Sequence, residues 1–177
     1  IEKAAVSAPP GHPINTLMEE HKILLDFASN LERASSNLRI EKDNAKISEW
    51  MKAIEYIVKH LKESEKHYLR EENVLFPYIE KHGITEPPKV MWSEHDKIRA
   101  KKKEIYDIYE RDVGNPNELG NNITQKAIEL AEITSSHFFK ENNILFPAAM
   151  KVIPPNEWQE ISVQFEEVGY CCFTPQS

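Results

Sequence analysis

The chain has few glycines, few cysteines and no long apolar run. Its 177 residues include 5 Gly and 2 Cys, while 40% are hydrophobic and 29% are charged. This composition suits one helical domain with an ample core. Cys171 and Cys172 are adjacent and near the end of the chain, which argues against a disulfide framework and for the reducing cytosol. No apolar stretch is long enough to cross a bilayer, so we expect a soluble protein.

Cationic side chains are also in the minority. The chain has 22 Lys and Arg against 29 Asp and Glu, which gives a net charge of -7 at pH 7. An acidic surface attracts neither nucleic acid nor an anionic membrane, so we expect neither partner.

The N-terminal residues lack a methionine, and they lack the charged start and long apolar region of a secretion signal. Residues 1–11 are therefore interpreted as a linker of a longer chain. We assign residues 12–153 to a helical bundle and residues 154–177 to a short helix and tail.

One motif, His-x-x-x-Glu-x-Asn-[Val/Ile]-Leu-Phe-Pro, occurs twice, beginning at His67 and at His137. The matching glutamates, Glu71 and Glu141, keep the same offset of 70 residues. On a helix, four residues advance about 6 Å and return to nearly the same face, so each copy presents an imidazole and a carboxylate on one side. A single copy would be interpreted as a surface ion pair. Two copies with matching apolar flanks indicate two halves of a metal site in a helical bundle.

Apolar residues recur every three or four positions in four long segments, and each apolar stripe contains one histidine. The segments begin near Thr16, Ile47, Pro87 and Leu119. Their histidines are His21, His67, His95 and His137. We expect Thr16 and Glu19 to form a capping box, and Pro77 to kink or end the second helix. Short turns between long helices predict an all-α fold, an up-down-up-down four-helix bundle with a short C-terminal helix around Trp158.

The four histidines and two glutamates would leave many buried polar groups unsatisfied unless something binds them. Six protein ligands exceed a tetrahedral zinc site and suit two ions that share carboxylates. Each ion would take two imidazoles, Glu71 and Glu141 would bridge, and a solvent-derived oxo or hydroxo group would complete the core. Imidazole-rich, sulfur-free coordination favours two iron ions, with manganese, cobalt or zinc as alternatives. Open positions would remain for dioxygen, nitric oxide or peroxide.

Three further residues are candidates for an extra ligand or for support of the ligands. His12 could fold back as a ligand or lid, or cap a loop. Glu94 and Glu63 could support neighbouring histidines, or they could be solvated carboxylates on a helix face. Ligating histidines usually donate their second N–H to a carboxylate or a carbonyl. The carboxylates that could accept it are Glu20, Glu63, Glu72 and Glu94.

The Glu20-His21 pair, the two repeated motifs and Glu94-His95-Asp96 together resemble the hemerythrin-like, or HHE cation-binding, domain family over residues 12–150. The resemblance implies a non-haem di-iron site in a four-helix bundle. The implied ligands are His21 and His67 for one iron, His95 and His137 for the other, and Glu71 and Glu141 as bridges.

Two features differ from the oxygen-carrying hemerythrins. The third helix of those carriers supplies two histidines one turn apart, whereas Met91 and Arg99 flank His95 at that spacing here. The last motif is His-x-x-x-Glu and not His-x-x-x-x-Asp. The pattern is more similar to the subgroup of di-iron proteins implicated in iron–sulfur cluster repair and nitric oxide stress, and to an iron-sensing domain of a ubiquitin ligase subunit.

The two ends of the chain also resemble larger prokaryotic proteins in which such a domain adjoins a PAS-type sensor domain. We therefore predict a module of a signalling protein that binds or senses a small molecule, or the redox or iron state. A neighbouring sensor domain is the expected partner. The alternative is an enzyme that reduces nitric oxide or decomposes peroxide, or a protein that donates iron in cluster repair.

Overall fold

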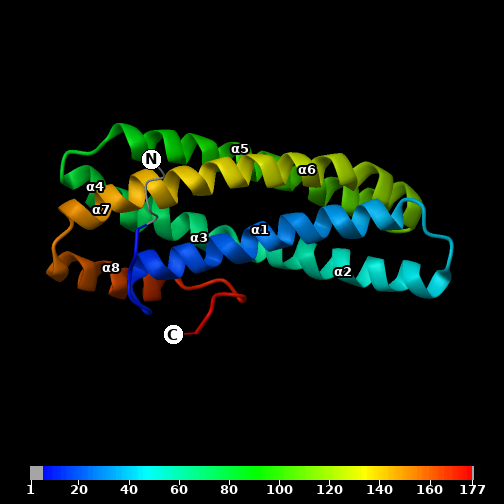
Figure 1. Ribbon diagram of the computed structural model, residues 1–177, viewed down its shortest axis with the longest axis horizontal. Helices are drawn as coiled ribbons and strands as arrows, with labels where there is room; N and C mark the ends of the chain where they lie inside the picture. The colour runs from blue at the N-terminus through cyan, green and yellow to red at the C-terminus, as the bar shows by residue number, and fades with distance from the viewer. Residues whose placement is uncertain (1–5, 177) are drawn as a thin grey trace. The chain divides into compact units, whose positions relative to one another are not determined.

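Helices form all of the regular structure that is described. The computed structural model describes residues 6–176, and every regular element in that range is helical, so the predicted all-α class is confirmed. The elements, of which Figure 1 labels the α-helices, are α1 (Pro13–Leu38), α2 (Asn44–Glu63), α3 (Glu65–Arg70), η1 (Glu71–Leu75), α4 (Phe76–Lys81), α5 (Glu86–Asp112), α6 (Pro116–Lys140), η2 (Glu141–Leu145), α7 (Phe146–Val152) and α8 (Pro155–Val168). Both η elements are π-helical.

Two sequence predictions concern the N-terminal linker and the lack of a membrane span. The linker predicted for residues 1–11 falls partly on residues 1–5, which lie outside the described residues. Among the described helices, none combines the length and the apolar character that a membrane span requires.

Helix α1 begins three residues before the predicted start at Thr16. The ring Nδ1 of His12 accepts the N–H of Ile14 at 3.1 Å, and the carbonyl of His12 accepts the N–H of Thr16 at 3.1 Å. Pro13 fits the first helical position because its missing N–H would have no partner there. The predicted capping box is therefore wrong, since Thr16 lies inside α1 and His12 caps it.

The predicted second helix is interrupted twice. At Ser64, a ψ of -8° departs from the α-helical value, and the N–H of His67 bonds to the Ser64 carbonyl, three residues back, at 3.0 Å. In η1, the N–H of Phe76 reaches the carbonyl of Glu71, five residues back. Pro77 has no N–H, and in an α-helix its ring would crowd the carbonyl four residues before it, so the wider π turn accommodates it. The helix continues past Pro77 as α4.

The chain forms two compact units. The first contains the residues up to Ile23, Glu63–His95 and the chain from Ser136 on; the second contains Leu24–Lys62 and Asp96–Ser135. The candidate site residues that were predicted from the repeated motifs and the helical stripes all belong to the first unit.

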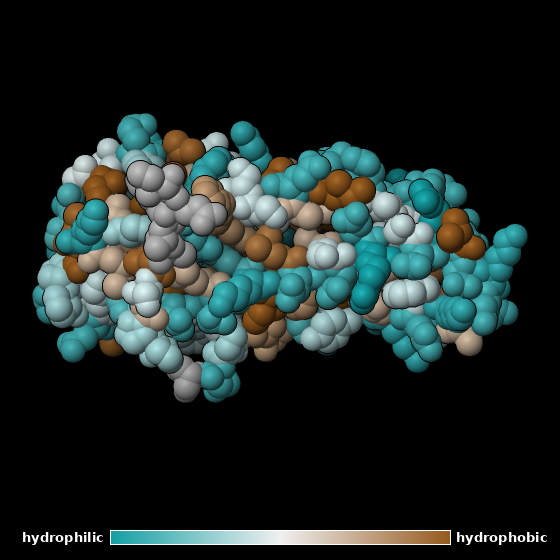
Figure 2. Space-filling model, in the orientation of Figure 1, coloured by the Kyte–Doolittle hydropathy of each residue, from teal (hydrophilic) through white to brown (hydrophobic). Residues whose placement is uncertain are grey.

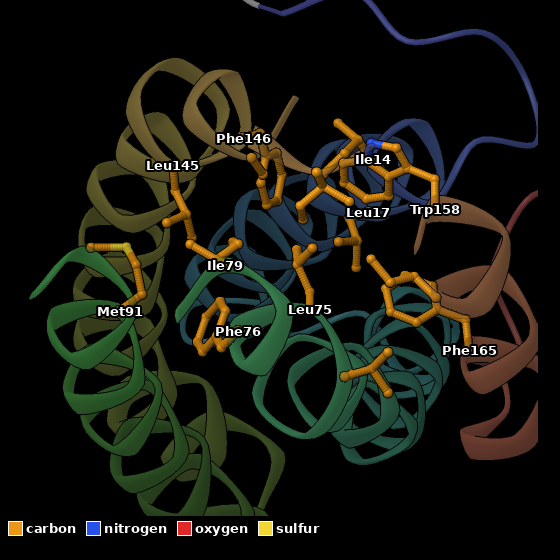
Figure 3. Packing of buried hydrophobic residues seen from close by; sticks show 14 residues of the cluster. Ile14, Leu17, Leu75, Phe76, Ile79, Met91, Leu145, Phe146, Trp158 and Phe165 are labelled. Atoms are coloured by element: carbon orange, nitrogen blue, oxygen red, sulfur yellow. The ribbon is translucent and has the colours of Figure 1, made fainter. Parts of the chain in front are cut away.

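The first unit has a dense apolar core. Side chains from α1, η1, α4, α5, η2, α7 and α8 form one buried cluster, which Figure 3 shows from close by. Phe76 and Phe146 are fully buried in it, and Trp158 and Phe165 of α8 complete it. Helix α8 packs against α3 and η1, so the C-terminal helix contacts the segments that carry the first repeated motif.

In the second unit, α6 approaches the end of α1 closely. A Cβ atom on Gly120 would lie 2.6 Å from the backbone N of Arg39 and 2.6 Å from the carbonyl oxygen of Ser35. Asn117 Nδ2 donates to the carbonyl of Leu38 at 2.9 Å nearby. Glycine is required here because any side chain would push the two backbones apart.

Figure 2 shows mostly hydrophilic side chains on the face in view, with hydrophobic residues scattered among them. Among the described residues, the large hydrophobic side chains that are exposed include Val90 and Ile144. Both belong to the first unit and line a pocket that is discussed below.

We predict that Gly120→Ala lowers the free energy of unfolding by about 1–3 kcal/mol, the usual cost of overpacking. The matched control is Gly114→Ala, because a Cβ at Gly114 would meet nothing within 4 Å. Urea unfolding of the metal-free protein measures both variants. Equal midpoints for the two variants would contradict a close backbone approach at Gly120.

Candidate metal centre

Six of the predicted residues meet in the first unit. They come from six elements: His21 from α1, His67 from α3, Glu71 from η1, His95 from α5, His137 from α6 and Glu141 from η2. All six are 0–1% exposed. The helical stripes therefore do bring one histidine from each predicted helix into the interior.

The four histidines form two pairs, and Glu71 lies near one histidine of each pair. The ring centroids of His21 and His67 are 4.9 Å apart, and those of His95 and His137 are 4.8 Å apart. Glu71 Oε1 lies 2.8 Å from His67 Nε2 and 3.8 Å from His95 Nε2. Glu71 thus lies close to one histidine of each pair.

Glu141 has the corresponding position on the other side. Its Oε1 lies 3.0 Å from His137 Nε2 and 3.3 Å from His21 Nε2. Potential ligand atoms within 4.8 Å of one another form two groups: the four residues His21, His67, Glu71 and Glu141, and the three residues His95, His137 and Glu141. Glu141 belongs to both groups.

Eight buried atoms of this centre have no hydrogen-bond partner. They are the Nε2 atoms of the four histidines and both carboxylate oxygens of Glu71 and Glu141. Buried polar atoms are normally paired, because leaving one unpaired costs about 1–3 kcal/mol. Imidazole nitrogens and carboxylate oxygens are metal ligands, so these atoms fit one or more metal ions.

The other ring nitrogen of each histidine has a partner. His67 Nδ1 lies 3.0 Å from Glu20, His95 Nδ1 lies 2.7 Å from Glu72, and His137 Nδ1 lies 2.9 Å from Glu94. A carboxylate can only accept here, so Nδ1 carries the proton and the lone pair on Nε2 points into the centre. The sequence prediction named these three carboxylates as candidates, and each contacts a different histidine.

His21 has an amide partner that the sequence prediction missed. Its Nδ1 lies 2.8 Å from Asn142 Oδ1. A signal for Asn142 was present, since it follows Glu141 as Glu72 follows Glu71 in the other copy of the motif. The two residues after the paired glutamates thus serve the two histidines that lie outside the repeats.

Two other candidates lie elsewhere. His12 caps α1 as described above, and its ring packs against Trp158 with centroids 4.5 Å apart. Glu63 is exposed at the end of α2. Neither belongs to the groups of potential metal ligands, and the exposure of Glu63 matches the alternative of a solvated carboxylate.

The two cysteines are also outside the ligand groups. Both are free; Cys172 is exposed and Cys171 is buried. Burial raises the pKa of the Cys171 thiol to about 12, so this sulfur is a neutral thiol at pH 7.

Two of the supporting carboxylates, Glu20 and Glu94, each accept hydrogen bonds from a cationic side chain. Arg70 donates two hydrogen bonds to Glu20, and Lys140, at the equivalent place in the second motif, donates to Glu94. Burial would raise the pKa of Glu20, but the hydrogen bonds from His67 and Arg70 outweigh burial and hold the pKa well below its ordinary value. Glu20 is therefore an anion that can accept the proton of His67.

The ligand side chains themselves are displaced in pKa. Burial lowers the pKa of His67 to about 4 despite the opposing effect of Glu20, so its ring is neutral at pH 7. Burial and the nearby Glu141 raise the pKa of Glu71. Two facing carboxylates in a dry interior are unfavourable without a cation, which is a further sign that the centre is built for metal.

Each π turn is followed by a phenylalanine whose ring stacks on a site histidine. In an α-helix, the residue five positions after another lies about 140° around the axis from it, whereas in η1 the N–H of Phe76 bonds directly back to Glu71. Phe76 then stacks on His95 with ring centroids 5.7 Å apart. In η2, Phe146 stacks in the same way on His21, also at 5.7 Å.

A helical domain that turns eight unpaired nitrogen and oxygen atoms into its interior has the character of a metal-binding protein. The family model of the hemerythrin HHE cation-binding domain matches residues 12–149, so the chain belongs to the hemerythrin family. No curated protein gives a significant match to the chain. The family match ends before α8, which leaves that helix and the following residues outside it.

We predict that Glu141→Gln lowers metal affinity at least tenfold and reduces the metal content more than Glu71→Gln does. Glu141 belongs to both ligand groups, whereas Glu71 belongs to one. Glu71→Gln should also stabilise the metal-free protein, because it removes the repulsion between two facing buried carboxylates. Metal analysis and urea unfolding test the two effects, with the exposed Glu63→Gln as control. Full metal content in both variants would contradict the role of these carboxylates.

We predict that the metal-free protein loses stability as the pH falls from 6.5 to about 4. His67 takes up a proton at 6.5 in the unfolded chain but only near 4 when folded, so the unfolded state binds more protons in this window. Burial lowers the pKa of His95 too, which acts in the same direction. In His137, the effect of burial is outweighed by Glu141 and Glu94, which raise its pKa, so its contribution is lost as the pH rises.

Urea midpoints at pH 7, 6, 5 and 4 measure this dependence. His67→Gln should flatten it, because glutamine keeps a donor for Glu20 and does not titrate. The same pH dependence in His67→Gln as in the parent protein would contradict the assignment.

Proposed function

We propose that this domain holds two iron ions, one between His21 and His67 and one between His95 and His137, with Glu71 and Glu141 shared by both. The observation that carries the proposal is the set of eight buried atoms without a hydrogen-bond partner. The two close histidine pairs, and the contact of each glutamate with one histidine of each pair, support the sharing. Manganese, cobalt and zinc are the alternatives. The fold proposed to hold these ions is the up-down-up-down four-helix bundle.

A small molecule is the proposed ligand of this centre. The ligand group of His95 and His137 has three members where the other group has four, which leaves more room for an external ligand. Iron ions would supply redox chemistry and open coordination positions for dioxygen, nitric oxide or peroxide. The chain's own residues would hold the ions and keep bulk water out, since all six are nearly fully buried.

A pocket of about 280 Å³ favours an apolar molecule at this second group. It is lined by Val90, Met91, Ile144 and Leu145 among others. Met91 lies one helical turn before His95, and Leu145 lies one turn after Glu141, so two lining residues of the pocket belong to the segments that carry these two ligands. Small uncharged gases such as dioxygen and nitric oxide are compatible with such a lining.

Binding or sensing is the function that this centre supports best. The six proposed ligands are 0–1% exposed, an arrangement that suits stoichiometric binding of a gas or a response to redox or iron state. Reduction of nitric oxide would require steady delivery of electrons and protons to a buried site. Decomposition of peroxide would require this polar substrate and the water it forms to pass through the apolar surroundings, and donation of iron would require the site to open. We place the domain in the sensing and stress-repair subgroup of the family, as a cytosolic module that acts on a neighbouring domain of a signalling protein.

We expect the purified protein loaded with Fe²⁺ under nitrogen to bind two irons per chain and then one small molecule, with nitric oxide as the probe. Absorption spectra before and after dithionite, and after nitric oxide, would record oxidation state and binding. Stoichiometric binding without sustained consumption supports the sensor. Sustained consumption with an electron donor would show the enzyme instead, and absence of iron or a single zinc would refute the di-iron centre.

A further inference from the structure

The chain after α8 returns to the metal centre. Gly169 has a φ of 93°, a left-handed value that favours glycine, and it allows the chain to turn at the end of α8. In Figure 1 this segment is the red part of the trace. It lies outside residues 12–149, so nothing in the family match accounts for it.

This segment covers the Arg70 side chain. Arg70 Cζ lies 4.9 Å from the ring centroid of Tyr170, and Arg70 Nη2 lies 3.7 Å from Cys171 Sγ. The ring centroid of Phe165 in α8 lies 5.6 Å from Arg70 Cζ. Arg70 is fully buried as a result.

Thr174 of the same segment bonds directly to the carboxylate that supports His67. Its Oγ1 donates to Glu20 Oε2 at 2.6 Å. Glu20 Oε1 accepts from His67 Nδ1 at 3.0 Å and from Arg70 Nη1 at 2.9 Å, and Oε2 also accepts from Arg70 Nη2. An ionised carboxylate has about four acceptor sites, so Thr174 completes the set.

The other half of the centre lacks this cover. Glu94 supports His137 at 2.9 Å and is held by Lys140, which repeats the relation of Glu20 to His67 and Arg70. However, the Glu94 side chain is 20% exposed, whereas that of Glu20 is 0% exposed. Water screens the Glu94 interactions, while those of Glu20 act in a dry environment in which hydrogen bonds are stronger.

We propose that residues 169–174 position His67 through Glu20, and thereby make the metal position of His21 and His67 different from that of His95 and His137. Thr174 is the positioning residue. The fixed carboxylate holds the His67 ring in one orientation and keeps Nδ1 protonated, so that the Nε2 lone pair faces the metal. The effect on metal rests on the proposed function, but the effect on the His67 ring does not.

The first test uses the metal-free protein. In Thr174→Val, which keeps the shape but loses the hydroxyl, the ring N–H of His67 should exchange with solvent faster, as measured by NMR with labelled histidine. The ring N–H of His137 should be unchanged, and Thr174→Ser should restore the slow exchange. Unchanged exchange at His67, or an equal change at His137, would overturn the proposal.

The second test uses Fe²⁺ as the probe under nitrogen. Thr174→Val should weaken the binding of one of the two ions about tenfold, the lower end of the usual effect of a lost supporting contact, and leave the other unchanged. Lys140→Met should weaken the other ion, because it loosens Glu94. Equal weakening of both ions by Thr174→Val would overturn the proposed inequality. If the parent protein bound no iron, the proposed function would fail, while the ring exchange would still decide the role of Thr174.

Discussion

Two buried carboxylates face each other among four imidazoles, and this electrostatic constraint governs the first unit. Without a cation, burial and Glu141 raise the pKa of Glu71, and eight nitrogen and oxygen atoms lack partners. A fold that only needed stability would fill this space with apolar side chains. The unfavourable burial of these polar groups is offset by a surrounding core of aromatic and aliphatic residues, in which Phe76 and Phe146 pack against the histidines.

The support of the histidines follows the internal repeat and departs from it in an informative way. Residues 72 and 142, which directly follow the site glutamates, contact the histidines of α5 and α1. Residues 20 and 94, which directly precede those histidines, contact the histidines of the repeats. The geometry is nearly twofold, yet one supporting carboxylate is sealed by the C-terminal segment and the other meets solvent. Symmetry of the ligands is thus combined with asymmetry of their surroundings.

The sequence predicted the helical class and the burial of the four histidines, because helical periodicity directly encodes which residues share a face. It predicted carboxylate partners only as a set, since Glu20 and His67 lie on different helices and their pairing depends on packing. The break at Ser64, the π turns and the cap at His12 escaped prediction for the same reason: local propensity does not specify them. Thr174 escaped because a polar residue in a loop carries no periodic signal.

The π turns make the length of the motif as important as its letters. Each turn contains one residue more than an α-helical turn between the site glutamate and the phenylalanine whose N–H bonds back to it. Loss of a single residue between Glu71 and Phe76 would leave a regular α-helical turn, and the helix downstream would keep nearly the same orientation. The proline that follows Phe76 would then stand inside an α-helix, where its ring crowds the carbonyl four residues before it. The extra residue of the π turn therefore allows one continuous helix to carry both the site glutamate and the proline.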